Sequence, residues 1–183
     1  MPLLCQKSGS LLRKPEVQFS LPSMMKAYRA HKGTLQSGAV VPPSTSFFDA
    51  MREDKKAAER FLESVRPPHL PKRENAIFVF EDEVQGREWA SREKRYLYIV
   101  ELKQNGILHR ADWCWLSVIM GALMKNDPQT TMYANNYWAG EATERPVWEL
   151  LVGSATVVEE IIIPELERNR LRFEAHSLPD LRD

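Results

Sequence analysis

Two apolar runs near the C-terminus most constrain how this chain can fold. Residues 147–152 (VWELLV) and 156–163 (TVVEEIII) are rich in residues that favour β-strands, and a Gly-Ser-Ala break separates them. The pattern predicts two consecutive strands, so the fold must contain a sheet that takes both. The first run holds one acid, Glu149, among apolar neighbours. Because a buried carboxylate costs free energy unless partners or a task compensate it, Glu149 is the first candidate for a functional residue.

Patterns elsewhere in the chain predict more short strands, with helices between them. Strands are predicted at 16–21, 34–41, 76–80, 95–102 and 107–111, and helices at 24–31, 49–65, 82–92 and 112–124. Residues 66–73 (RPPHLPKR) are predicted to be an extended linker, because prolines stop both helices and central strands. Since strands and helices do not alternate regularly, the expected fold class is mixed α+β rather than a doubly wound parallel sheet.

The length of 183 residues suits one domain with tails. We expect an N-terminal lead-in at 1–15, one domain at 16–163 and a C-terminal tail at 164–183. A helix is one option for the tail. No apolar run approaches the roughly 20 residues that span a bilayer, and the N-terminus is too weakly apolar for a secretory signal. Cys5 and Cys114 give no disulfide framework. A cytoplasmic location is therefore expected, with delivery by a specialised secretion system left open.

Charge is unevenly spread along a chain whose net charge is zero. Residues 1–75 carry 13 Lys and Arg against 7 Asp and Glu, and the remainder carries 12 against 18. A basic first half suits an anionic ligand such as a dinucleotide, or nucleic acid. Alternatively, the two halves neutralise each other across the fold. The sequence has no dense basic patch of the kind that dedicated nucleic-acid binders carry.

Motifs for several common chemistries are absent from the sequence. The four histidines, at 31, 69, 109 and 176, are far apart and form no HxxxH pattern, so no metal site is expected. Neither a GxSxG turn for a nucleophile nor a Walker or GxGxxG phosphate loop is present. These absences leave Glu149, the aromatic residues shortly before it, and a few polar side chains. The polar and aromatic candidates are Ser44, Ser46, His109, Tyr133, Tyr137 and Trp138.

A carboxylate that faces aromatic rings suits a reaction through a cationic, sugar-like transition state. The acid stabilises developing oxocarbenium charge and holds a ribose hydroxyl, while a ring face supports a planar group. Cleavage of the nicotinamide–ribose bond of NAD requires this pairing.

The segment YWAGEATERPVWELLVGSATVVEEI, residues 137–161, resembles the closing segment of ADP-ribosyltransferases, especially the DarT-like group. The layout is also similar to an uncharacterised bacterial group of ADP-ribosyltransferase-like proteins that carry YxVEL, HRADW and YW…E-LV segments. The matching segments here are 98–102, 109–113 and 137–152. The resemblance extends over roughly residues 16–163, and each motif in it is short.

This resemblance implies a mostly antiparallel, split sheet with inserted helices, in a bacterial toxin or effector that uses NAD as a substrate and needs no metal. Glu149 would be the catalytic glutamate that contacts the nicotinamide ribose. The residues implied to bind NAD are Tyr133, Tyr137, Trp138, Ser44, Ser46 and His109. The acceptor would be a protein or a nucleic acid, with no membrane partner. Such transferases usually place a His or Arg on their first strand, whereas the strand predicted at 16–21 has neither.

Two other functions remain open. One is a non-catalytic binding or effector module of the same fold, and the other is an RNA-end or nucleotide-processing enzyme on a related fold. The candidate residues also have ordinary structural explanations. Glu149 could pair with Arg145 or a neighbouring residue on a solvent-facing strand, the aromatic residues could be core, and Ser44 or Ser46 could cap a helix.

Overall fold

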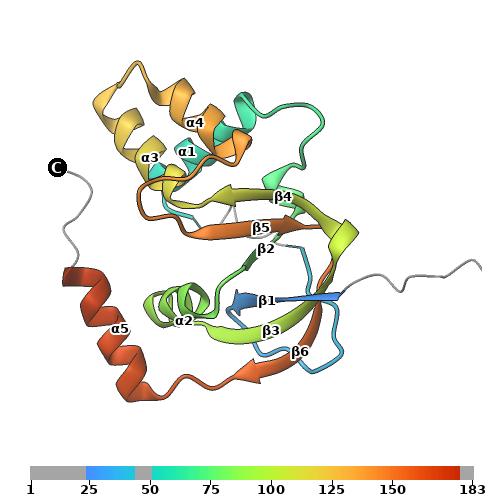
Figure 1. Ribbon diagram of the computed structural model, residues 1–183. Helices are drawn as coiled ribbons and strands as arrows, with labels where there is room; N and C mark the ends of the chain where they lie inside the picture. Colours follow the sequence, from blue (N-terminus) through green and yellow to red (C-terminus); the bar gives the residue numbers. More distant parts are fainter. Residues whose placement is uncertain (1–23, 44–50, 178–183) are drawn as a thin grey trace, which may run out of the picture.

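A six-stranded antiparallel sheet with helices around it forms the molecule in the computed structural model, which describes residues 24–43 and 51–177 (Figure 1). The strands are β1 (Met24–His31), β2 (Ile77–Phe80), β3 (Tyr96–Lys103), β4 (Ile107–Asp112), β5 (Trp148–Val152) and β6 (Thr156–Ile161). The helices are α1 (Glu53–Ser64), α2 (Glu83–Arg92), α3 (Cys114–Lys125), α4 (Thr130–Ala139) and α5 (Glu165–Ser177), with short 3-10 turns at Arg73–Asn75 and Gln104–Gly106. The mixed α+β class and the antiparallel pairing are therefore confirmed.

The sheet has the order β4-β5-β2-β1-β3-β6 and is weakly joined at its centre. β1 pairs with β3 along all its eight residues, but its register with β2 consists of the one pair Tyr28 and Phe80. In Figure 1 the strands β4, β5 and β2 diverge from β1, β3 and β6. The Arg29 side chain crosses this divide, because its Nη1 donates a hydrogen bond of 2.7 Å to the carbonyl oxygen of Phe78.

The helix predicted at 24–31 is wrong, because these residues form β1. Met, Lys, Ala and Arg favour helices locally, but propensity is a weak prior that tertiary contacts override. Pairing with β3 satisfies the backbone of the whole segment. Ala27 and Ala30 are both buried, on opposite faces of the sheet, where small side chains allow close packing.

Three other predicted segments differ from the structure or lie outside the residues that it describes. Residues 66–73 are not an extended linker: they turn back at Leu70, whose N–H donates to Pro67, and enter the 3-10 turn at Arg73. Residues 34–41 contribute only an isolated bridge between Val40 and Thr156, so they lie along β6 without forming a full strand. The strand predicted at 16–21 lies outside the described residues. The remaining predicted strands and helices are confirmed, with small shifts at their ends.

The two faces of the sheet are covered differently. One face packs into an apolar cluster that includes Tyr98, Val100 and Leu150. On the other face, α1, α3 and α4 lie over the part formed by β4, β5 and β2, as Figure 1 shows, and the cluster there includes Leu151 and Tyr137. Helix α2 packs on the same face at β1 and β3, where the cluster includes Ala90 and Leu97. Glu149 belongs to this helix-covered side, since neighbouring residues of a strand point to opposite faces. Among the described residues, no helix is long and apolar enough to cross a membrane.

Helix α2 lies close against the sheet at Gly86, which makes this position a sensitive one. A Cβ added there would lie 3.0 Å from Cβ of Tyr28 and 3.2 Å from Cδ1 of Leu97. We expect Gly86→Ala to lower the free energy of unfolding by about 1–2 kcal/mol, since crowding outweighs the better helix propensity of alanine. Gly121→Ala is the matched control, because Gly121 lies in α3 with nothing within 4 Å of the added Cβ. If urea unfolding gives Gly86→Ala and Gly121→Ala the same free energy of unfolding, α2 does not pack as closely on Tyr28 and Leu97 as described.

Candidate functional site

Glu149 lies on β5, the strand between β4 and β2. It lies opposite Phe80 of β2 on one side and Ala111 of β4 on the other. The residue is only 4% exposed, so its carboxylate sits under the helices and not at a solvent-facing surface. The alternative in which Glu149 pairs with Arg145 on a solvent-facing strand is therefore wrong.

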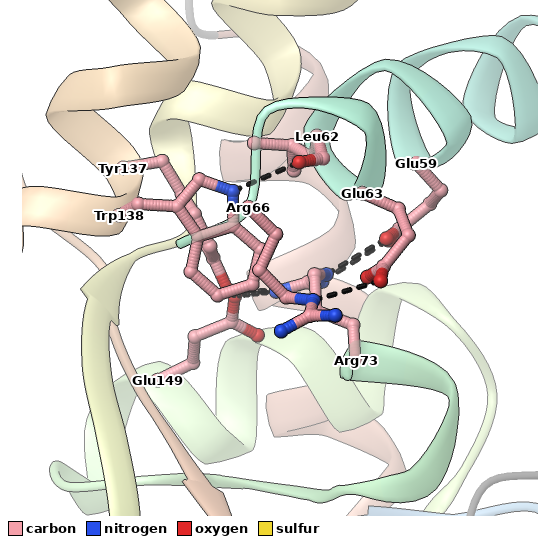
Figure 2. Close-up of polar contacts among 8 residues, drawn as sticks. All are labelled: Glu59, Leu62, Glu63, Arg66, Arg73, Tyr137, Trp138 and Glu149. Carbon is pink, nitrogen blue, oxygen red and sulfur yellow. Dashed lines mark hydrogen bonds and ion pairs between the residues drawn. The ribbon is translucent and has the colours of Figure 1, made fainter. Parts of the chain in front are cut away.

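The partner of Glu149 is Arg73, from the turn that precedes β2. Arg73 Nη1 lies 2.6 Å from Oε1 of Glu149. On its other side, the same guanidinium binds both carboxylate oxygens of Glu59 on α1, with Nε 2.7 Å from Oε2 and Nη2 3.0 Å from Oε1. Tyr137 of α4 completes the group: its hydroxyl contacts Arg73 and donates a 2.8 Å hydrogen bond to Oε1 of Glu149. We call these four residues the Arg73 cluster; Figure 2 shows them converging from four elements.

The Arg73 cluster is almost completely removed from water. Each of its four residues is at most 6% exposed. Burial raises the pKa of the Tyr137 hydroxyl well above its usual value, so this group remains protonated and can donate. Burial alone would lower the pKa of Arg73, but Glu149 and Glu59 outweigh that effect and raise it, so the guanidinium remains charged. A buried charge set of this kind persists only when hydrogen bonds and opposite charges compensate the lost hydration.

The two oxygens of Glu149 have different surroundings. Oε1 accepts hydrogen bonds from both Arg73 and Tyr137. Oε2 accepts no hydrogen bond from the residues that the structure describes. A carboxylate held in this way has a fixed orientation and keeps one oxygen available as a hydrogen-bond acceptor.

Residues 20–163 match a family described as a protein of unknown function (DUF2441). The chain belongs to this family. No curated protein matches the sequence. The region that matches the DUF2441 family contains all four residues of the Arg73 cluster, whereas α5 follows the end of the match.

Within the DUF2441 region, the structure brings some of the predicted site residues together. Tyr137 contacts Glu149 directly, as described above. His109 lies beside Tyr137, with ring centroids 5.9 Å apart and Nε2 3.3 Å from the Tyr137 carbonyl oxygen. Burial lowers the pKa of His109, which favours its neutral form. Trp138 is 5% exposed and donates to the Leu62 carbonyl at 2.9 Å, so it serves the core beside the cluster.

Other predicted site residues lie elsewhere. Tyr133 stacks on Trp115, with ring centroids 5.9 Å apart, and its hydroxyl donates to Gln129 at 2.9 Å. The structure therefore does not bring Tyr133 into the Arg73 cluster. Ser44 and Ser46 lie outside the described residues. Within the parts of the chain that the structure describes, no group of three or more His, Cys, Asp or Glu is placed to hold a metal ion.

Sequence reasoning missed Arg73 and Glu59. Arg73 follows a proline-rich segment that predicts only a linker, and nothing in that segment indicates a buried cation. Glu59 had a weak signal, because it lies on α1 between Ala58 and Leu62, two residues that become fully buried. An acid on the apolar stripe of a helix needs a buried partner, as does an acid in an apolar strand.

Proposed function

We propose that this DUF2441 chain is an ADP-ribosyltransferase-like enzyme that cleaves NAD and transfers ADP-ribose to a macromolecular acceptor, a protein or a nucleic acid. The observation that carries the proposal is the asymmetric hydrogen bonding of the Glu149 carboxylate. Its Oε1 is fixed by Arg73 and Tyr137, and its Oε2 is left as an acceptor. A developing positive charge is stabilised most by an acceptor that is already oriented and that lies in a site of low dielectric constant.

The reaction would use Glu149 on the ribose of NAD. The bond between C1′ of the ribose and the nicotinamide nitrogen breaks, and its electron pair leaves with nicotinamide. Positive charge develops on the ribose, and Oε2 of Glu149 stabilises it while it accepts a hydrogen bond from a ribose hydroxyl. The acceptor's nucleophile then bonds to C1′ and releases its proton to solvent. With water as the acceptor, the product is free ADP-ribose.

The first described strand carries basic residues. The expectation that the first strand lacks a basic residue rested on residues 16–21, whereas β1 contains both Arg29 and His31. β1 lies next to β2, and β2 lies next to β5, which bears Glu149. Burial, followed by the nearby charge of Arg95, lowers the pKa of Arg29 to about 10. Arg29 pairs with Tyr98, whereas Glu149 pairs with Phe80 and, across it, Tyr28, so Arg29 lies on the face of the sheet opposite to Glu149.

A second candidate function is a non-catalytic module of the same fold. The observation that favours it is the near-complete burial of Glu149 together with its ion pair to Arg73, an arrangement that also occurs as a purely structural device. In this case the cluster stabilises the sheet beneath α1 and α4, and a partner macromolecule binds elsewhere on the surface.

Addition of NAD to the purified chain separates the two functions. At a concentration about ten times Kd, we expect NAD to raise Tm by about 3–6 °C and nicotinamide to accumulate. AMP and nicotinamide, each added alone, are the control ligands. A rise in Tm without release of nicotinamide favours the non-catalytic module. If millimolar NAD changes neither Tm nor the nicotinamide concentration, the enzymatic proposal is wrong.

A further inference from the structure

The Arg73 cluster contains one more acid than its charge balance requires. Glu149 alone would neutralise Arg73, yet Glu59 is also present and is 6% exposed. A second buried acid beside a single guanidinium costs desolvation free energy, so a structural account by itself favours an apolar residue at this position. The extra acid indicates that Glu59 has a role besides charge balance, and its contacts with Arg73 define that role.

Glu59 binds the edge of the guanidinium that is formed by Nε and Nη2. Both of its oxygens are engaged, with Nε 2.7 Å from Oε2 and Nη2 3.0 Å from Oε1. This leaves Nη1 as the nitrogen that reaches Glu149, at 2.6 Å from Oε1. Figure 2 shows Arg73 between the two acids, with Glu59 on the helix side and Glu149 on the strand side. Nη2 keeps a second N–H on the edge that it shares with Nη1, but while Glu59 fixes the orientation of the guanidinium only Nη1 contacts Glu149.

An arginine and a carboxylate prefer a paired contact in which two N–H groups bind two oxygens. Without Glu59, Nη1 and Nη2 of Arg73 can both turn to Glu149 and bind both of its oxygens. Glu149 would then lose the oxygen that the proposed reaction needs. Helix α1 fixes Glu59 against this change, since the neighbouring Ala58 and Leu62 are fully buried.

We propose that Glu59 is a positioning residue that holds the guanidinium of Arg73 in a two-point contact and thereby keeps Oε2 of Glu149 free for the nicotinamide ribose. This inference rests on the proposed function. Glu59 touches no reacting atom; it acts only through Arg73.

The test is a set of variants that includes a rescue. Glu59→Gln breaks the two-point contact, and we expect kcat for nicotinamide release to fall about 10- to 100-fold while KM for NAD changes little. Arg73→Lys in the Glu59→Gln background removes the planar fork, so it cannot bind both oxygens of Glu149. The double variant should therefore be more active than Glu59→Gln alone. Glu63→Gln on the same helix is the control, since Glu63 pairs with Arg66 at 2.7 Å and should leave kcat unchanged.

The outcomes separate the two proposals. If the wild-type chain releases no nicotinamide, the proposed function is wrong and the role of Glu59 is wrong with it. If the wild type is active and Glu59→Gln has a normal kcat, only the positioning role is wrong; a double variant that is weaker than Glu59→Gln leads to the same conclusion. Should Glu59→Gln fail to fold, Glu59→Asp retracts the carboxylate while it keeps the charge. A folded Glu59→Asp variant with wild-type kcat overturns the inference, and a reduced kcat supports it.

Discussion

Replacement of Arg73 by methionine is expected to lower the free energy of unfolding by about 3–5 kcal/mol, because it leaves two acids buried without their shared cation. Glu59 and Glu149 are each at most 6% exposed, so solvent cannot easily replace the guanidinium. Tyr137 would keep its hydrogen bond to Glu149 but would face an uncompensated charge. Urea unfolding followed by tryptophan fluorescence measures the loss.

Lys56→Met provides the comparison for Arg73→Met. Lys56 pairs with Glu53 at 2.8 Å on α1, where the lysine side chain is 18% exposed and the acid 77% exposed, so water still screens the pair. Solvent-exposed pairs of this kind contribute at most about 1 kcal/mol. If Arg73→Met and Lys56→Met lower the free energy of unfolding equally, the Arg73 cluster contributes less to that free energy than its burial indicates.

Glu149→Gln should abolish most of the release of nicotinamide from NAD, with a fall in kcat of about 100- to 1,000-fold. The amide keeps the shape of the side chain and an oxygen for Arg73 and Tyr137, but it has no negative charge to offset the developing positive charge on the ribose. Binding should be affected less than turnover, since the acid acts mainly on the transition state. The measurement is kcat and KM for nicotinamide release, together with Kd for NAD.

The control for Glu149→Gln is Glu160→Gln, which alters an exposed acid on β6. Because Glu160 lies on the opposite edge strand of the sheet from β4, it should leave kcat unchanged. A folded Glu149→Gln variant that releases nicotinamide at the wild-type rate would exclude Glu149 as the catalytic acid.

Much of the fold could be predicted because the relevant signals are local. The strands at 76–80, 95–102 and 147–152 are short runs of β-branched and aromatic residues, and the structure has β2, β3 and β5 there. The helix predicted at 82–92 is α2, and the side chain of Asp82 caps it by accepting a hydrogen bond from the Gln85 N–H at 3.0 Å. β1 could not be predicted, since its residues favour a helix locally and only pairing with the distant β3 makes them a strand.

The candidate site could be predicted only in part, for a similar reason. An acid in an apolar strand indicates that Glu149 needs a partner, but that partner, Arg73, lies 76 residues earlier in the chain. No sequence pattern links a residue after a proline-rich turn to a strand so far away. The contact between Tyr137 and Glu149 was easier to anticipate, because the two residues are separated by only 12 positions.

A crystal structure of the chain soaked with a carbocyclic analogue of NAD, in which the scissile bond is stable, tests the central claim most directly. We expect a hydroxyl of the nicotinamide ribose to lie within about 3.2 Å of Oε2 of Glu149, with Arg73 and Tyr137 still bound to Oε1. If the analogue binds away from Glu149, or if crystals soaked at millimolar concentration contain none of it, Glu149 does not act on the ribose of NAD.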